Sequence, residues 1–367
     1  MPAATVPKAM SASSPSLPPW ALGPFVRPDN ARPLIRPNAA SRFDCPLRQE
    51  PVAWEARHTF NPAAVVHEGR VVILYRAEDD QGPGGIGGYT SRLGLAVSDD
   101  GLDFRTEPHP VYFPAEDAQK PFEWTGGCED PRLATGPDGT YVLTFTQFPG
   151  RNPAGGNFPW RIGLATSRDL RTWTKHGGAF QGTPHENLRI KSAGILQTLE
   201  NGRLVAARVR GKYWMYFGES FVSIASSDDL VHWTPLTDAH GAPLQIMRPR
   251  AGFFDSEFTE VGPPPLLTEH GIVLVYNGKN RDQAADGDPN LPTGAYACGQ
   301  ALFDKDDPVK FLARLDRPFF QPELEWETAG QYEGGTTFAE GLVFFQGRWL
   351  LYYGCADTFV GCAHTSV

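Results

Sequence analysis

Residues 122–132, FEWTGGCEDPR, contain two adjacent carboxylates, Glu129 and Asp130, closely followed by Arg132. A carboxyl group beside a guanidinium can donate or accept a proton in a controlled way, because the neighbouring charge sets its pKa. The same residues also fit a charged turn in which Asp130 simply pairs with Arg132. The elements that must position these residues decide between the two interpretations.

A repeating pattern surrounds this stretch. AVSDDGLDF begins at Ala96, ATSRDLRTW at Ala165 and ASSDDLVHW at Ala225, and ALFDKDDPVKF from Ala301 is a degraded copy. The first three share Ala-x-Ser, a following Asp and an aromatic ninth residue. Each copy follows a short strand, a tight turn and an apolar run, so each unit is predicted to contain four short strands. This pattern is typical of a propeller blade.

The sequence predicts five such units, at residues 58–105, 127–175, 190–236, 257–315 and 333–365. The predicted fold class is therefore all-β, a five-bladed β-propeller, with a β-sandwich as the alternative. The 39 glycines, 34 prolines and 12% aromatic residues suit a β protein with many turns. The last unit is one strand short, and an N-terminal strand would complete it and close the ring.

The composition limits the domain organisation. Residues 1–20 are rich in Pro, Ser and Ala and are predicted to be a disordered tail, which leaves 21–367 as a single catalytic domain. The tail lacks the apolar core of a signal peptide, and no later segment has the ~18 apolar residues that span a bilayer. A cytoplasmic location is therefore expected.

The charge and the cysteines exclude other classes of function. The net charge is −9 and no basic run is present, so neither a nucleic acid nor a membrane is an expected partner. The five cysteines form no Cys-x-x-Cys pair, and we expect buried free thiols, no metal site and no cofactor. The sequence predicts no particular oligomeric state.

Polar residues recur where each predicted inner strand begins. The segments are 58–62, 128–132, 189–192, 257–261 and 333–336. Because inner strands of a propeller line a central funnel, these side chains are expected to meet in one pocket. Converging carboxylates suggest glycoside cleavage, in which an acid protonates the leaving oxygen and a base activates water. No Ser-His-Asp arrangement, phosphate-binding loop or His-Glu-x-x-His motif offers another chemistry.

Eight ordered motifs between residues 55 and 365 resemble glycoside hydrolase family 130. They are FNPA (60–63), YRAED (75–79), SRLGLAVSDDG (91–101), GGCEDPR (126–132), KSAGIL (191–196), GKYWMYFGE (211–219), EVGPPPL (260–266) and YYGCADTFVG (352–361). The resemblance implies a five-bladed propeller that acts on β-mannosides. The family includes β-mannoside phosphorylases, which use inorganic phosphate, and β-1,2-mannosidases, which use water.

The resemblance assigns catalytic roles. Asp130 matches the general acid, which in the phosphorylases passes its proton through a sugar hydroxyl. Glu219 and Glu260 match the water-activating pair of the hydrolytic branch, with Glu257 as an alternative to Glu260. Together they imply an inverting hydrolase that releases mannose from β-1,2-linked oligosaccharides.

Two other functions stay open. A phosphorylase needs several cations aimed at one spot, and Lys191, Arg208 and Arg210 are the nearest in sequence, with Arg189 and Lys212. A propeller that binds carbohydrate without catalysis is the second alternative.

The remaining predicted site residues bind the sugar. Trp124 and Tyr216 would stack on sugar faces, and Asp357 matches a mannose-contacting aspartate of the family. Arg76 could instead pair with Glu78 or Asp79 as scaffold. The full predicted substrate-binding set is Asn61, Arg76, Asp79, Trp124, Arg132, Lys191, Tyr216 and Asp357. Rim loops are expected at 81–90, 151–160 and 281–296.

Overall fold

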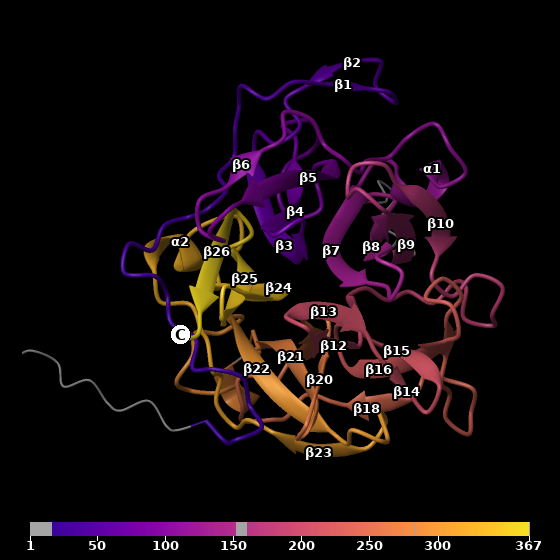
Figure 1. Ribbon diagram of the computed structural model, residues 1–367. Coiled ribbons are helices and arrows are strands. Elements are labelled where there is room, and N and C mark those ends of the chain that lie inside the picture. The colour runs from indigo at the N-terminus through magenta and orange to yellow at the C-terminus, as the bar shows by residue number, and fades with distance from the viewer. Residues whose placement is uncertain (1–16, 152–159, 283, 367) are drawn as a thin grey trace, which may run out of the picture.

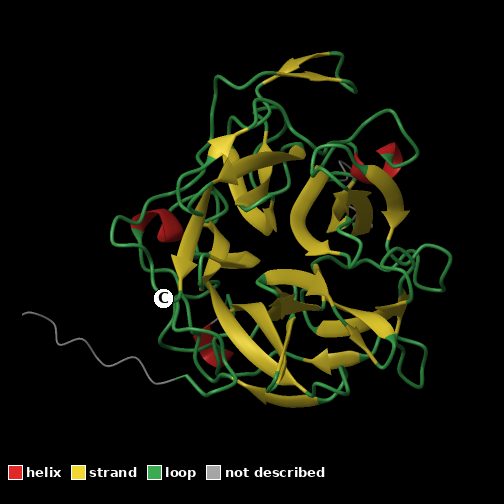
Figure 2. Cartoon of the chain, in the orientation of Figure 1, coloured by secondary structure: helices red, strands yellow, loops and turns green. Residues whose placement is uncertain are grey.

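The computed structural model describes residues 17–151, 160–282 and 284–366. Strands dominate, and the helices are single turns, as Figure 2 shows. The all-β class is therefore confirmed. Residues 1–16 of the predicted tail, most of the predicted rim loop 151–160, and residue 283 lie outside the described residues.

The strands follow the predicted units closely. A small hairpin, β1 (Phe43–Cys45) and β2 (Glu50–Val52), precedes them. The first unit holds β3 (His58–His67), β4 (Arg70–Glu78), β5 (Ser91–Ser98) and β6 (Arg105–Thr106). Helix α1 (Lys120–Glu123) leads into the second, with β7 (Gly127–Thr135), β8 (Tyr141–Phe148), β9 (Arg161–Ser167) and β10 (Thr174–Gly178).

The third unit is the most divided. It contains β11 (Ala193–Ile195), β12 (Gln197–Glu200), β13 (Arg203–Ala206), β14 (Arg208–Val209), β15 (Lys212–Phe217), β16 (Val222–Ser227), β17 (Thr234–Pro235) and β18 (Gln245–Met247).

The last two units complete the chain. The fourth contains β19 (Phe258–Val261), β20 (Leu266–Thr268), β21 (Gly271–Lys279), a 3₁₀ turn η1 (Ala284–Asp286), β22 (Tyr296–Phe303) and β23 (Phe311–Arg314). After α2 (Glu325–Thr328), the fifth contains β24 (Thr337–Phe345), β25 (Arg348–Cys355) and β26 (Phe359–His364).

The strand groups surround a common centre, as Figure 1 shows, but the hydrogen-bonded sheets do not coincide with five separate blades. The first two units join in one eight-stranded sheet. In the third unit, β12 pairs with β20 of the fourth unit, and β13 joins that sheet through β12. The first junction is a single parallel pair, Ser91 with Gly127. At Gly127, with φ +110°, a Cβ would lie 2.1 Å from the Ser91 carbonyl oxygen, so only glycine permits this approach. The closed five-bladed ring stays a prediction.

The N-terminal segment pairs with the last strand, as the short fifth unit predicted. The N–H of Val26 donates to the carbonyl of His364 at 2.9 Å, and the reverse bond is 2.8 Å. Further along, the Leu34 N–H donates to Val360 at 2.7 Å. These are isolated bridges rather than one continuous strand. Pro28 and Pro33 lie between them, and a proline has no N–H to donate to a strand ladder.

The repeated Ser-x-Asp residues form the same turn three times. In the first copy the Ser98 hydroxyl donates to Asp100 Oδ1 at 2.9 Å and accepts the Gly101 N–H at 2.8 Å. Residues 167–170 and 227–230 make both hydrogen bonds again. A serine at this place satisfies the backbone that leaves the third strand of each unit. The repeat in the sequence is therefore the repeat of a turn.

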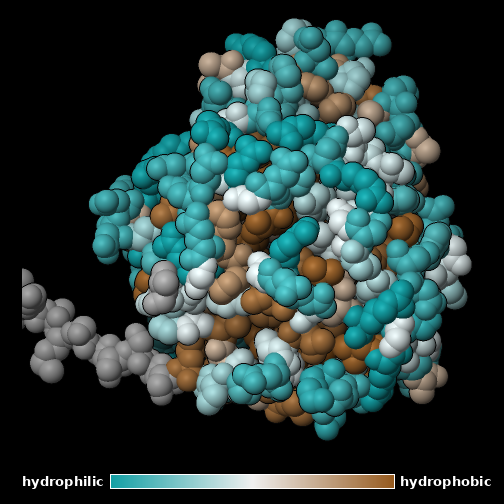
Figure 3. Space-filling model, in the orientation of Figure 1, coloured by the Kyte–Doolittle hydropathy of each residue, from teal (hydrophilic) through white to brown (hydrophobic). Residues whose placement is uncertain are grey.

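The aromatic ninth residue of the repeat belongs to the core. Trp233 is fully buried, and its Nε1 donates to the Leu230 carbonyl at 3.0 Å. Trp173 packs against the neighbouring core cluster. On the face seen in Figure 3, hydrophilic side chains predominate around the edge and hydrophobic side chains show toward the middle. In the described part of the chain, no helix is long and apolar enough to cross a membrane.

Candidate active site

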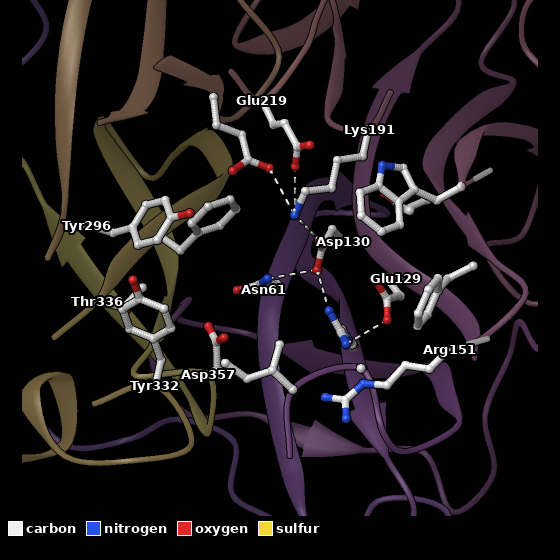
Figure 4. A pocket seen from close by; sticks show the side chains of 18 of the residues that line it. Asn61, Glu129, Asp130, Arg151, Lys191, Glu219, Tyr296, Tyr332, Thr336 and Asp357 are labelled. Carbon is white, nitrogen blue, oxygen red and sulfur yellow. Dashed lines mark hydrogen bonds and ion pairs between the residues drawn. The ribbon is translucent and has the colours of Figure 1, made fainter. Parts of the chain in front are cut away.

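A cavity of about 550 Å³ lies where the inner strands converge. Its size is usual for a small-molecule site. We call it the central pocket, and Figure 4 shows its side chains pointing toward one another from separate elements. Seven predicted site residues line it: Asn61, Arg76, Asp130, Lys191, Glu219, Glu260 and Asp357.

Asn61 on β3 and Asp130 on β7 reach the pocket by the same local structure. Each precedes a proline, has φ +49° and lies where the strand register shifts at a bulge. A bulge re-aims a side chain, and Asn and Asp tolerate a left-handed backbone better than most residues. Asn61 Nδ2 donates to Asp130 Oδ1 at 2.8 Å. The first two units therefore place one polar side chain each against the other.

Arg76 on β4 binds three carboxylates at once. Its Nη2 lies 2.7 Å from both Glu78 and Glu129, and its Nη1 lies 3.1 Å from Asp130 Oδ1. Burial works against the charge of Asp130, but Arg76 and then Lys191 outweigh it and lower the pKa of Asp130 to about 2. Asp130 is therefore ionised at neutral pH.

Lys191, just before β11, joins the acid to the two predicted bases. Its Nζ lies 3.5 Å from Glu260, 3.6 Å from Glu219 and 3.9 Å from Asp130. Burial and the nearby Glu219 raise the pKa of Glu260, while Lys191 and a hydrogen bond from the Ser192 hydroxyl work against that rise. Burial lowers the pKa of Lys191, but the three carboxylates raise it well above its usual value. Lys191 is therefore a permanent cation between the carboxylates.

Two other carboxylates of the pocket, Glu129 and Asp357, keep a proton at higher pH than Asp130 does. Burial raises the pKa of Glu129 to about 7, although Arg76 opposes the shift. Burial also raises the pKa of Asp357, in the turn between β25 and β26, to about 7. Groups with such pKa values cluster at functional sites because they can exchange protons near neutral pH.

Asp79 and Tyr216 were predicted to bind substrate, and the structure places both outside the pocket. Asp79 is buried in an ion pair with Arg92 at 2.8 Å. Tyr216 on β15 is fully buried, and its hydroxyl donates to the Pro308 carbonyl at 2.7 Å. Both side chains are held inside the units by their own partners.

Trp124 and Arg132 were also predicted to bind substrate, and the structure places both outside the pocket lining. Trp124 packs against the core of the first unit, with the guanidinium carbon of Arg48 5.2 Å from its ring. Arg132 is 1% exposed and forms an ion pair with the buried Glu340 at 3.0 Å. Its guanidinium also donates to backbone carbonyls, including that of Asp130, so it supports the site from behind. The charged-turn alternative, Asp130 paired with Arg132 through side chains, is wrong.

The cations proposed for phosphate binding lie elsewhere, except Lys191. Arg208 donates to the carbonyls of Gly211 and Asp228, and Lys212 Nζ lies 2.6 Å from Asp228. Arg210 lies 3.4 Å from Asp307. Arg189 stacks on Trp160, with its guanidinium carbon 3.9 Å from the ring centroid. The cations that line the pocket are Arg76, Arg151 and Lys191.

Sequence reasoning missed part of the pocket lining. Glu129 was visible beside Asp130 but was given no role. Trp160 entered the sequence analysis only as the last residue of the rim loop expected at 151–160. Tyr296 begins β22 of the fourth unit, Tyr332 lies between α2 and β24, and Phe148 ends β8. The end position of Tyr296 in the 281–296 insertion was the one signal for it.

Among the described residues, no group of three or more His, Cys, Asp or Glu side chains is arranged to hold a metal ion. The five cysteines are free and buried, as predicted.

Comparisons with known proteins show which family the chain matches. A family model described as beta-1,4-mannooligosaccharide phosphorylase matches residues 26–367. The 1,2-beta-oligomannan phosphorylase of Thermoanaerobacter sp. (strain X514) is 32% identical over 313 residues, covering 84% of this chain and 90% of that protein.

Solved structures extend the likeness to three dimensions. A glycosyl hydrolase from Bacteroides ovatus is 49% identical, with a TM-score of 0.90 and 95% of each chain covered. A second structure is also 49% identical, with a TM-score of 0.91 and 95% of each chain covered. It is described with the words that the GH130 family of mannoside phosphorylases contains glycoside hydrolases that target beta-1,2 mannosidic linkages in Candida mannan.

Proposed function

The chain belongs to glycoside hydrolase family 130, and we propose that it hydrolyses β-mannosides, releasing mannose from the end of an oligosaccharide. The names of its relatives support a β-mannoside substrate, and both the oligomannan phosphorylase and the hydrolases named for Candida mannan support a β-1,2 linkage. The oligosaccharide is the proposed partner.

The observation that carries the choice of water is the pair Glu219 and Glu260 around Lys191. A base is needed to take a proton from water, and one of these glutamates fills that role while the other holds the water. Asp130 delivers the proton to the glycosidic oxygen from the other side of Lys191. An acid and a base separated by a water molecule invert the anomeric carbon.

The charges of the pocket support water over phosphate. A phosphorylase must bind a dianion with several cations. Arg76 and Lys191 are already engaged by carboxylates, and Glu219 and Glu260 would repel the dianion. Arg151 is the remaining cation of the lining.

In this proposal Asn61, Arg76 and Asp357 hold the hydroxyl groups of the terminal mannose. Their polar atoms lie around Asp130, which is where the scissile bond must sit. Phe148 and Trp160, in contact as a T-shaped pair with centroids 6.1 Å apart, form an apolar wall on which a second sugar can stack.

Phosphorolysis is the second candidate, because the curated relatives and the family model are named as phosphorylases. It would use the same acid, with phosphate in place of water.

A single closed propeller over residues 21–367 and a cytoplasmic location complete the proposal.

The test is product analysis on β-1,2-mannobiose, with and without inorganic phosphate. We expect mannose alone, at a rate that phosphate does not change, with the α-anomer of the newly cleaved sugar appearing first by NMR. Mannose 1-phosphate that forms only when phosphate is present would replace hydrolysis with the second candidate. Binding of the disaccharide without turnover would favour the non-catalytic alternative.

Variants separate the roles of the glutamates. Glu260→Gln should lower kcat by about 10²–10⁴-fold, the usual contribution of a general base. Glu257→Gln is the matched control, since Glu257 lies three residues earlier and outside the pocket lining, and it should keep the wild-type rate. Equal losses in both variants would contradict the assignment.

A further inference from the structure

One guanidinium serves three carboxylates at the floor of the pocket. Arg76 contacts Glu78, Glu129 and Asp130, each within 3.1 Å. One positive charge balances only one of these carboxylates. All three are at most 8% exposed, so water does little to stabilise the remaining negative charge.

Arg151 also lines the pocket, but it forms no ion pair with a carboxylate of the described residues. Lys191 is the next positive group, and it is shared by Asp130, Glu219 and Glu260. Asp357 adds another carboxylate. An excess of buried carboxylates over cations binds a proton, because closely spaced like charges cannot all ionise.

The contacts of the three carboxylates differ, and the difference indicates where the proton resides. Asp130 accepts a hydrogen bond from Asn61 besides its two cations, and Glu78 accepts one from Gln331 at 3.3 Å. Glu129 accepts from Arg76 and, at 3.5 Å, from Ser91, both through Oε1. No described residue hydrogen-bonds its Oε2.

Glu129 also faces the pocket. The charged groups around it are Arg76 and Glu78 from β4, Asp130 from its own strand and Lys191 from the segment before β11. Glu129 lines the cavity, whereas Glu78 is fully buried behind it. Only Glu129 therefore combines a free carboxyl oxygen with access to substrate.

We propose that Glu129 stores the proton of the resting site and supplies it to Asp130 when the substrate is bound. This inference rests on the proposed function. The Oε2–H bond of Glu129 breaks, and its proton reaches the glycosidic oxygen through Asp130 as the C–O bond of the mannoside breaks. The attacking water gives its own proton to the glutamate pair, which releases it to solvent, and Glu129 takes up a proton from solvent after the products leave.

The electrostatics agree with this geometry. The pKa of about 2 leaves Asp130 without a proton at neutral pH, whereas the pKa of about 7 leaves Glu129 protonated in a large fraction of molecules. A general acid that is ionised at rest needs such a donor. Glu129 acts through Asp130 and is a positioning and proton-storing residue in this scheme.

Glu78 supplies a matched control. It is the same residue type and lies at the same 2.7 Å from the same Arg76 atom, but it has no access to the pocket. Glu129→Gln and Glu78→Gln each remove one carboxylate from Arg76. A purely structural role would make the two variants behave alike.

The first measurement is the pH dependence of kcat/KM, which reports the ionisations of the free enzyme. We expect the wild-type value to fall above about pH 7, where Glu129 loses its proton. Glu78→Gln should keep this decline but shift it to lower pH, since one fewer negative neighbour eases the ionisation of Glu129. Glu129→Gln should lose the decline and most of the activity. A decline near pH 7 that persists in Glu129→Gln overturns the proposal and assigns it to another group such as Asp357.

The second measurement does not need activity, so it separates this proposal from the proposed function. NMR of enzyme labelled with ¹³C only at glutamate carboxyl carbons leaves Asp357 silent. The resonance of Glu129 should titrate near pH 7 in the wild type and at a lower pH in Glu78→Gln, and it should be absent in Glu129→Gln. If no glutamate titrates there, or if the resonance survives in Glu129→Gln, the proposal fails even in an active enzyme.

Discussion

Replacing Arg132 by methionine tests how the pocket is held in place. The guanidinium donates to the backbone carbonyls of Val261 at 2.7 Å, Asp130 at 2.9 Å and Gly262 at 3.1 Å. It also pairs with Glu340 at 3.0 Å, where both side chains are at most 1% exposed. One side chain therefore joins the strand of the acid, the strand of Glu260 and β24.

The expected cost follows from these contacts. Removing one partner of a buried ion pair costs about 3–5 kcal/mol, because the other charge stays buried without compensation. The carbonyls that lose their donor add about 1–3 kcal/mol for each one left without a partner. We expect Arg132→Met to lower the free energy of unfolding by at least about 4 kcal/mol, a large share of the 5–15 kcal/mol of an ordinary protein.

A second substitution separates the two contributions. In the double variant Arg132→Met with Glu340→Met no charge is left unpaired, and we expect it to be about 2–3 kcal/mol more stable than Arg132→Met alone. Urea unfolding of the wild type, both single variants and the double variant gives this coupling directly. A loss below about 1 kcal/mol for Arg132→Met, or no recovery in the double variant, would refute the reasoning.

Two further predictions concern the pocket and its frame. Lys191→Met should lower kcat/KM by at least about 100-fold, because Glu219, Glu260 and Asp130 lose their shared cation. The pH profile of kcat/KM should also show a raised pKa for the catalytic base, since a carboxylate without a nearby cation holds its proton more tightly. An unchanged profile would contradict this role. Gly127→Ala should destabilise the fold by about 2–4 kcal/mol in urea unfolding, since the new Cβ would meet the Ser91 carbonyl. The control is Gly139→Ala, which lies in an open turn with φ +80° and should cost about 1 kcal/mol in the same experiment. Equal costs would show that the approach at Gly127 is not tight.

The sequence predicted best those features that depend on local chemistry. The Ser-x-Asp repeat was recognisable because each copy makes the same hydrogen bonds to its own turn. Asn61 and Asp130 were found because each lies at the polar start of a predicted inner strand and within a motif of the resemblance, FNPA or GGCEDPR. These signals lie within a few residues of chain and need no knowledge of the packing.

The errors came from contacts between distant segments. Glu129 was given no role. Neighbouring side chains of a regular strand point to opposite faces, but the bulge on β7 brings both Glu129 and Asp130 into the pocket. Tyr216 lies on a strand whose inward face could not be known without its neighbours. Arg132 reaches carbonyls about 130 positions later in the chain, which no local pattern reveals.

The pairing of residue 26 with residue 364 has a consequence for biosynthesis. On the ribosome the segment around Val26 emerges long before β26, so the two can join only after the strands between them have been made. Until then the edge of the first-made sheet and the unpaired segment remain open to other chains. A chain that stops short of β26 would keep most of its units but lose this seam, and it should be recovered as aggregate rather than as active enzyme.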